Sequence, residues 1–271
     1  MLKIITAYQE FKEFRNTLES ISFVPTMGNL HKGHMTLIDK AKSYDAHVSA
    51  SIFINPLQFN DTSDFNNYPK SLNDDIALLS KHGCDSVFIP DSSILENIKE
   101  IKAPDTALYL CGMNRPGHFD GVLTIVNKLF EITKPTRSFF GKKDFQQLTL
   151  IKNFVKENNL PVEIISVDTV RELNGLAMSS RNNRLSESDR EKASKLYETL
   201  SLIKDNSNKL SNEIINKHKD NLIRQGFDVD YLSVCDPISL KDLEDFNSKP
   251  MLVAIAASIS GIRLIDNLLI D

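Results

Sequence analysis

The sequence predicts an α/β protein with a parallel sheet covered by helices on both faces, followed by a smaller C-terminal α+β domain. Over the first two thirds of the 271 residues, short apolar runs alternate with helix-like segments. Apolar residues make up 41% and charged residues 25% of the chain, which is typical of a globular protein with a hydrophobic core. After about Thr169 the chain becomes rich in Asn, Ser and Arg. We therefore expect a larger domain over residues 1–170 and a smaller one over residues 171–271.

The elements of the first domain are predicted from its apolar runs and from residues that start or end helices. Ser71-Leu-Asn-Asp74 resembles a capping box with Asp in place of Glu, and it should open a helix that Gly83 closes. Further helices are expected over residues 122–133 and 145–157. Five runs are predicted as strands: residues 22–26, 47–54, 85–90, 137–141 and 162–168.

The second domain begins with a helix for which Ser186 is the expected N-cap. Its apolar positions recur at helical spacing: Ala193, Leu196, Tyr197, Leu200 and Ile203. A polar helix should follow over residues 212–225, then strands over residues 231–235 and 252–257. The pattern leaves residues 262–269 undecided.

Charge and cysteine content narrow the class of protein. The chain has 32 Lys and Arg against 36 Asp and Glu, a net charge of -4, so a broad nucleic-acid-binding surface is not expected. The three cysteines, Cys84, Cys111 and Cys235, form neither a C-x-x-C pair nor a zinc spacing, which favours a reducing compartment. There is no signal-peptide pattern and no run long enough to span a bilayer. We expect a cytoplasmic protein.

The strongest chemical signal is the segment Val24-Pro-Thr-Met-Gly-Asn-Leu-His-Lys-Gly-His34, where an apolar strand runs into a glycine-containing loop. His31 and His34 lie three residues apart, so both rings should share one face of the first helical turn. The free amides and the positive dipole end of that turn favour an anion, and two imidazoles can add donors to a phosphate. Gly33 would let the phosphate approach the backbone. We therefore predict nucleotide phosphate binding here.

Two other interpretations of the histidines stay open. A pair at this spacing can ligate a metal ion, although no neighbouring carboxylate or cysteine completes a ligand set. His31 could instead serve as a purely structural helix cap.

The segment Ser51-Ile-Phe-Ile-Asn-Pro-Leu-Gln-Phe59 ends where open α/β sheets place ligands. Asn55 and Gln58 should face the same crevice as the histidines and offer amides to a polar substrate. The alternative is that Asn55-Pro56 is a simple turn and that Gln58 is solvated.

A second polar strand end follows Gly141, where Lys142, Lys143 and Asp144 begin the next helix. A lysine at this point supplies a positive charge for phosphate. Asp144 could cap the helix or accept hydrogen bonds from ribose hydroxyls, and the residues do not decide between these roles.

Two further segments are candidates for binding. The turn-rich segment Arg115-Pro-Gly-His-Phe-Asp-Gly121 is interpreted as a mobile loop or lid. Met178-Ser-Ser-Arg181 combines two hydroxyls with a guanidinium, which suits the outer phosphates of a nucleotide, although alone it would more often be a linker. The P-loop, dinucleotide, zincin and GxSxG motifs are all absent from the sequence. The remaining class is a nucleotide-using α/β enzyme that activates its substrate by nucleotidyl transfer.

Taken together, these segments resemble the pantothenate synthetase (pantoate–beta-alanine ligase) family of the H-x-G-H nucleotidyltransferase superfamily. The resemblance covers nearly the whole chain. It rests on five motifs in the family's order: PTMGNLHKGH from Pro25, FINPLQF from Phe53, RPGHFDGV from Arg115, FGKKDFQQL from Phe140 and MSSRN from Met178. It implies a Rossmann-like first domain that binds nucleotide and pantoate, and a second domain that covers the active site.

The resemblance also implies a two-step reaction. Pantoate attacks the α-phosphorus of ATP to give pantoyl adenylate and pyrophosphate, and the amine of β-alanine then displaces AMP to give pantothenate. Catalytic roles fall to His34, His31 and Lys143, while Gln58 and Gln147 would hold pantoate, with Gln58 also near β-alanine. The implied ATP site comprises Met27, Gly28, Asn29, Leu30, His31, Lys32, Gly33, His34, Gly141, Lys142, Lys143, Asp144, Val170, Met178, Ser179, Ser180 and Arg181.

The resemblance implies Mg²⁺ accompanying ATP, without assigned protein ligands, no tightly bound organic cofactor, and a homodimer. Two positions depart from the family pattern: Lys32 stands where an acidic residue is common, and Lys142 replaces a common Glu. The alternatives are a nucleotidyltransferase that adenylylates a phosphate-bearing acceptor and a non-enzymatic nucleotide sensor.

Overall fold

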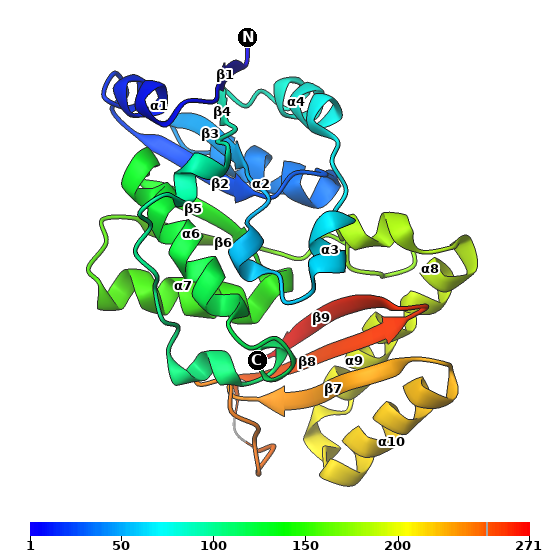
Figure 1. Ribbon diagram of the computed structural model, residues 1–271. Helices are drawn as coiled ribbons and strands as arrows, with labels where there is room; N and C mark the ends of the chain where they lie inside the picture. Colours follow the sequence, from blue (N-terminus) through cyan, green and yellow to red (C-terminus); the bar gives the residue numbers. More distant parts are fainter. Residues whose placement is uncertain (248) are drawn as a thin grey trace. The chain divides into compact units, whose positions relative to one another are not determined.

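The computed structural model describes residues 1–247 and 249–271 (Figure 1). The chain divides into two compact units, and each unit is assembled from three segments. Unit 1 comprises residues 1–103, 115–142 and 150–168, and unit 2 comprises residues 104–114, 143–149 and 169–271. The single boundary near residue 170 stays a prediction, but two short segments on its N-terminal side belong to unit 2.

Unit 1 is built on a six-stranded parallel sheet, which confirms the predicted fold class. The spatial order of the strands is β1-β4-β3-β2-β5-β6, so the chain moves outward in both directions from β2. The strands are β1 (Lys3–Ile5), β2 (Ile21–Thr26), β3 (His47–Ile52), β4 (Ser86–Phe88), β5 (Arg137–Gly141) and β6 (Glu163–Val167). The carboxyl ends of all six strands therefore lie at one edge of the sheet, where open parallel sheets bind ligands.

Helices cover both faces of this sheet, as the sequence predicts. On one face, apolar strand residues such as Val24 and Val87 share a core with Ile38 of α2 (Lys32–Lys42) and Leu79 of α4 (Leu72–Lys81). On the other face, Phe88 packs against Phe11 of α1 (Tyr8–Arg15), with the two rings tilted and their centroids 4.8 Å apart. Burial on both faces explains why the strands are largely apolar, with small serines at several of the other buried positions. The remaining helices that lie wholly or partly in unit 1 are α3 (Thr62–Asn66), α6 (His118–Thr133) and α7 (Phe145–Glu157), with the 3₁₀ turns η1 (Pro56–Gln58) and η2 (Ser92–Leu95).

Unit 2 has its own core on a three-stranded antiparallel sheet, ordered β7-β8-β9. Alternate residues of β8, among them Val253 and Ile255, face the helices, and Leu200 and Leu222 complete this core. The strands are β7 (Asp228–Cys235), β8 (Met251–Ile259) and β9 (Ile262–Ile270). The helices are α5 (Cys111–Asn114), α8 (Glu187–Ala193), α9 (Lys195–Asp205) and α10 (Asn212–Arg224), with η3 (Asp105–Leu108), η5 (Ser180–Arg184) and η6 (Ser207–Lys209), while η4 (Lys142–Asp144) spans the change of unit.

Two local predictions are wrong. The expected capping box at Ser71 and Asp74 is absent, because Ser71 makes no side-chain cap bond and its hydroxyl donates to Asp75 instead. The single helix expected after Ser186 is divided into α8 and α9 at Ser194. Within the described residues, no helix combines the length and apolar character needed to cross a membrane.

Candidate active site

The loop between β2 and α2 turns sharply at the sheet edge. Gly28 has a φ of +81° and Asn29 a φ of +48°, both in the left-handed region, which glycine adopts freely and which Asn tolerates better than most residues. The Gly28 amide donates to Thr26 Oγ1 at 3.2 Å, and the Thr26 hydroxyl donates to the Ser51 carbonyl of the neighbouring strand at 2.7 Å. These contacts tie the start of the loop to the strand ends.

His31 and His34 cap the start of α2 reciprocally. The Gly33 amide donates to His31 Nδ1 at 3.1 Å, and the His31 amide donates to His34 Nδ1 at 3.3 Å. The two rings lie 4.1 Å apart between centroids. Because each Nδ1 accepts a backbone N–H, the ring proton of the neutral imidazole lies on Nε2 in both residues. The loop therefore fixes the tautomer of both histidines and makes both Nε2 atoms donors.

This geometry brings together two roles that the sequence leaves as alternatives. His31 is a helix cap, as the structural interpretation holds, but the cap uses only Nδ1. Phosphate binding would use Nε2, so the two roles are compatible on one ring. For the metal interpretation, residues 1–247 and 249–271 contain no group of three or more His, Cys, Asp or Glu side chains that could hold an ion.

The expectation that the amides of the first turn of α2 are free for an anion is wrong for Gly33 and His34, whose amides donate to the ring and to the carbonyl of His31, and the loop amides are also engaged. The amides of Asn29 and Leu30 donate to the carboxylate of Asp75, at 2.9 and 2.7 Å. Those of His31 and Gly33 donate to the histidine rings. Side chains thus satisfy these four amides, and the two imidazole rings supply Nε2–H groups in addition to their capping bonds.

Gln58 is buried beside this loop. Its Nε2 lies 3.1 Å from the sulfur of Met27, and its Oε1 accepts from Asn55 Nδ2 at 3.0 Å. The solvated alternative for Gln58 is therefore wrong. Asn55 also donates to the Gly121 carbonyl at 3.0 Å, while its Oδ1 accepts from the Leu57 amide. Asn55 Nδ2 uses both of its hydrogens within the protein, so Asn55 orients Gln58 instead of donating to a substrate as predicted, whereas Gln58 Nε2 has a second N–H to offer.

The segment Arg115–Gly121 contacts the backbone of Gln58 and stabilises its position. The Arg115 guanidinium donates to the Gln58 carbonyl at 3.1 Å, and His118 Nδ1 lies 2.6 Å from the same oxygen. The expectation of a mobile lid is wrong for the second half of this segment, because His118 and Phe119 are buried in the first turn of α6.

Lys142 and Lys143 point to different partners although they are adjacent. Lys142 Nζ pairs with Asp168 at 2.6 Å in an exposed ion pair of unit 1. Lys143 belongs to unit 2 and is the more buried of the two, with 17% of its side chain exposed against 45% for Lys142. Its ammonium lies 3.8 Å from Asp144.

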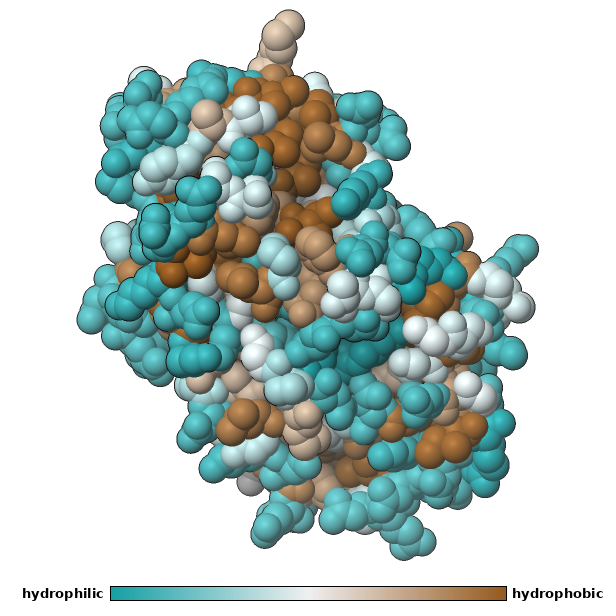
Figure 2. All heavy atoms as spheres, in the orientation of Figure 1, coloured by the Kyte–Doolittle hydropathy of each residue, from teal (hydrophilic) through white to brown (hydrophobic). Residues whose placement is uncertain are grey.

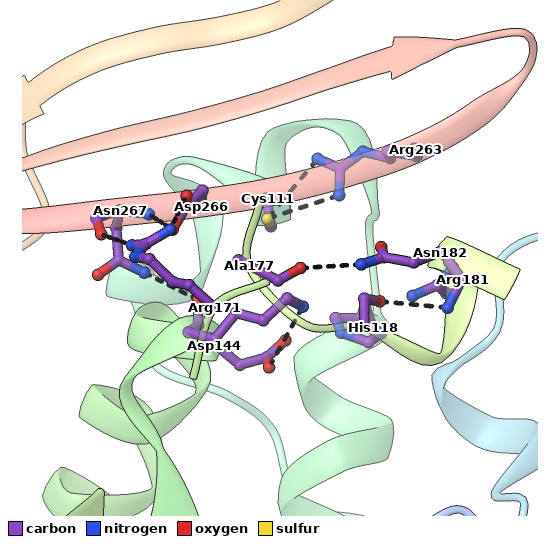
Figure 3. A network of polar contacts seen from close by, with 12 residues as sticks. Cys111, His118, Asp144, Arg171, Ala177, Arg181, Asn182, Arg263, Asp266 and Asn267 are labelled. Carbon is purple, nitrogen blue, oxygen red and sulfur yellow. Dashed lines mark hydrogen bonds and ion pairs between the residues drawn. The ribbon is translucent and has the colours of Figure 1, made fainter. Parts of the chain in front are cut away.

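Figure 3 shows Arg171, Asp266 and Asn267 in a network of polar contacts at β9, and this network also holds the Lys143 backbone. Asn267 Nδ2 donates to the Lys143 carbonyl at 2.8 Å. The preceding residue, Asp266, forms a two-point ion pair with Arg171, whose guanidinium lies 3.8 Å from the centroid of Tyr197. Burial raises the pKa of Asp266, and the Arg171 guanidinium opposes that shift. Asp266 and Asn267 went unnoticed in the sequence because they lie 95 or more residues from their partners.

The other predicted nucleotide residues also meet in unit 2. The Met178 amide donates to the Val170 carbonyl at 2.9 Å, and Ser179 caps η5 by accepting from the Arg181 amide. Gln147 is half-buried in α7, whereas its neighbour Gln146 is buried and bonded to the Cys111 amide and the Tyr109 carbonyl. Of the predicted site, unit 1 thus holds residues 27–34, Gln58, Gly141 and Lys142, and unit 2 holds the remainder.

Comparison with known proteins gives consistent matches. A family model described as "Pantoate-beta-alanine ligase" matches residues 2–269. The chain is 41% identical over 266 residues to the pantothenate synthetase of Shewanella loihica, covering 96% of this chain and 94% of that protein. It is 40% identical over 282 residues to the pantothenate synthetase of Thermosipho africanus, covering 99% and 100%.

Solved structures agree with these matches. The pantothenate synthetase of Thermus thermophilus matches with a TM-score of 0.91 and 37% identity, over 99% of each chain. The pantoate-beta-alanine ligase of Francisella tularensis, complexed with beta-gamma ATP and beta-alanine, matches with a TM-score of 0.84 and 37% identity, over 99% of this chain and 98% of that one.

Proposed function

This chain belongs to the pantoate-beta-alanine ligase family, and from that premise we propose that it uses ATP to join pantoate and β-alanine into pantothenate. The observation in its own structure that best supports the proposal is the reciprocal cap of His31 and His34. The cap places the ring proton of both residues on Nε2 at one helix start, and such donors suit the phosphates of a nucleotide. The F. tularensis relative was solved with both an ATP species and β-alanine.

In the first step, a carboxylate oxygen of pantoate attacks the α-phosphorus of ATP. The bond from that phosphorus to the bridging oxygen breaks, and pyrophosphate leaves with the electron pair. Charge shifts toward the leaving group, so His34 and His31 act as preorganised donors and Lys143 as a positive charge at the phosphates. The protein need supply no nucleophile.

In the second step, the amine of β-alanine attacks the acyl carbon of pantoyl adenylate. The bond from the acyl carbon to the AMP oxygen breaks, the amine loses a proton, and AMP leaves. Gln58 and Gln147 hold pantoate through their amides, and Gln58 also lies near β-alanine. Burial of Gln58 beside Met27 supports this assignment, since a fixed amide orients a substrate better than a mobile one.

The remaining nucleotide contacts are proposed for the residues that the motifs indicate. Asp144 would contact ribose, and the segment Met178–Arg181, with Val170 paired to it, would complete the ATP site. We also propose that Mg²⁺ accompanies ATP. The described residues offer no ready cluster of carboxylates and histidines, which fits an ion held mainly by phosphate oxygens and water. A cytoplasmic location and a homodimer are part of the same proposal.

Product analysis tests this function directly. The protein is incubated with ATP, Mg²⁺, pantoate and β-alanine, and the products are identified by mass spectrometry. We expect pantothenate, AMP and pyrophosphate, with pyrophosphate also released when β-alanine is omitted. A dinucleotide product with a phosphate-bearing acceptor would instead support the adenylyltransferase alternative, and an absence of products would support the sensor. Pyrophosphate that appears only after β-alanine is added would contradict the two-step mechanism.

A further inference from the structure

We propose that Asp75 is a positioning residue for the adenylation step, because its carboxylate holds the loop that aims His31 and His34. The inference rests on the proposed function of those two histidines. Asp75 lies in the first turn of α4, far from the motif in sequence, and is 2% exposed. Its role would be to fix the backbone between β2 and α2.

The carboxylate accepts three hydrogen bonds from around the loop. The Leu30 amide donates to Oδ1 at 2.7 Å, and the Asn29 amide donates to Oδ2 at 2.9 Å. The Ser71 hydroxyl also donates to Oδ1, at 3.1 Å. Each carboxylate oxygen therefore accepts a hydrogen bond from one backbone amide of the β2–α2 loop. A neutral amide at this position could accept from only one of the two, because its NH₂ group would face the other donor.

Gly28 allows this close approach. A Cβ on Gly28 would lie 3.0 Å from Asp75 Oδ2 and 3.1 Å from Ile52 Cγ2, closer than ordinary contacts. Its φ of +81° would also strain any other residue. The glycine of the motif therefore lets the carboxylate reach the amides of the next two residues.

Leu30 packs against the core, but the rest of the loop borders open space. Met27, Gly28, Asn29, Ser71 and Asp75 are among the residues that line a cavity of about 390 Å³. Figure 2 shows apolar side chains gathered beside α4 on the visible face of this unit. Because the loop borders this cavity, it has room to relax if the carboxylate is lost. The hydrogen bonds to Asp75 therefore add to the Thr26 contact and to the packing of Leu30 in fixing the position of the loop.

Loss of the Asp75 carboxylate would displace His31 and His34. Leu30, which Asp75 holds, precedes His31, and the His31 amide in turn sets the tautomer of His34. A shift of about 1 Å in a catalytic group lowers rates by on the order of 10²-fold. Asp75 thus acts on the reaction through the backbone and not by touching substrate.

The test compares Asp75→Asn with Asp74→Asn. Both replacements remove one negative charge from the first turn of α4, but Asp74 is exposed. For Asp75→Asn we expect kcat for pantoate-dependent pyrophosphate release to fall by on the order of 10²-fold, with a smaller change in KM for ATP. Asp74→Asn should stay within roughly twofold of the unmodified protein, as for most surface substitutions. Equal activity of the two variants would overturn the proposal.

A spectroscopic readout separates positioning from a general structural role. Long-range ¹H–¹⁵N NMR of the imidazoles should show the Nε2–H tautomer for His31 and His34 in the unmodified protein and in Asp74→Asn. Asp75→Asn should lose this signature at both rings while the amide spectrum of unit 2 is retained. If Asp75→Asn does not fold, Ser71→Ala removes one donor to the carboxylate and should give a smaller change in the same direction.

Two outcomes would contradict the positioning role. Unchanged ring spectra in a folded Asp75→Asn would show that the carboxylate does not fix the histidines. A kinetic defect cured by higher Mg²⁺ would make Asp75 a metal ligand instead. Failure of the unmodified protein to form pantothenate would count against the proposed function, while the ring spectra would still report on Asp75.

Discussion

At the scale of single residues, the two ring nitrogens of His31 and of His34 have different roles. Nδ1 accepts a backbone N–H and builds the start of α2, and Nε2 carries the proton that the proposed chemistry uses. Removing the ring therefore has two separable effects, one on the stability of the helix and one on the reaction.

His31→Ala and His31→Asn separate these effects. Asn is a good N-cap and can accept the Gly33 amide, but it places no donor where Nε2 lies. We expect His31→Ala to lower the free energy of unfolding by about 1 kcal/mol and His31→Asn to restore most of it. Both should slow adenylation by on the order of 10²-fold, the scale for one lost preorganised donor. Denaturant unfolding and pyrophosphate release measure the two quantities. An active His31→Asn would restrict His31 to the cap.

The two adjacent lysines should differ in the same assay. Lys143→Ala should lower kcat more than it weakens ATP binding, because a charge beside the shifting phosphoryl charge stabilises the transition state more than bound ATP. Lys142 is engaged with Asp168 at the surface, so Lys142→Ala or Lys142→Glu should change either quantity by less than about tenfold. Pyrophosphate release at saturating pantoate compares them. Equal damage from Lys142→Ala would show that this protein uses its extra lysine.

At the scale of elements, the first turn of α6 packs directly on η1. A Cβ on Gly121 would lie 2.2 Å from the Leu57 carbonyl oxygen and 2.8 Å from the Gln58 amide nitrogen. The glycine thus sets the distance between the two elements, and that distance sets where Gln58 lies.

Gly121→Ala should therefore weaken pantoate binding indirectly, through the position of η1 and without a contact to the substrate. Overpacking should lower the free energy of unfolding by about 1 to 3 kcal/mol, and displacement of η1 should raise KM for pantoate more than KM for ATP. Gln58→Ala is the direct comparison and should raise KM for pantoate by the equivalent of roughly 1 to 3 kcal/mol. Steady-state kinetics with each substrate varied would decide. Equal changes in both KM values would count against a role for this packing in substrate binding.

The elements that could be predicted from sequence are those with strong local signals. The bounds of β5 and α7 match the prediction, since an apolar run and a helical apolar stripe define them locally. Strand β1 was missed because it has three residues, and α1 because it is mostly exposed. The prediction for residues 71–74 went wrong because the Ser71 hydroxyl turns to a carboxylate that also serves the β2–α2 loop.

The candidate site shows the same limit. The motifs identify side chains that carry chemistry, such as His34 and Lys143, from residue type and position. They do not identify Asp75 or Asn267, whose contacts reach 45 and 124 residues along the chain. An aspartate in a helix start has the same local pattern whether it is solvated or holds a distant loop, and only the folded chain distinguishes the two.

At the scale of the whole molecule, unit 2 depends on segments that precede residue 169. Cys111, from the segment 104–114, lies 3.1 Å from the Tyr231 hydroxyl in β7 and close to Arg263 in β9. The segment 143–149 carries the Lys143 carbonyl that Asn267 binds. A fragment of residues 171–271 would lack both.

Thiol alkylation tests whether that fragment folds. Burial raises the pKa of Cys235 to about 12, so in the intact chain at pH 8 its thiolate fraction is roughly 10³-fold below that of an unperturbed thiol. We expect Cys235 to be protected in the intact chain and to be labelled readily in the isolated fragment, as read by mass spectrometry. Cys84, whose pKa burial also raises to about 12, is the matched site in unit 1 of the intact chain. Equal protection of Cys235 in the fragment would show that residue 170 is a sufficient boundary.

The reciprocal histidine cap also affects how this sequence can change over generations. In most enzymes, a catalytic side chain can be replaced without weakening the fold, so inactive but folded variants can persist and diverge. Here each ring that would act on ATP also closes the first turn of a helix in the central core. Most replacements at either position should lower stability and activity together, and only a cap-forming residue should keep the stability while the activity is lost. A descendant that abandoned the reaction would still be expected to keep cap-forming residues at these positions, with Asn, Ser, Thr or Asp as the accessible substitutes for His31.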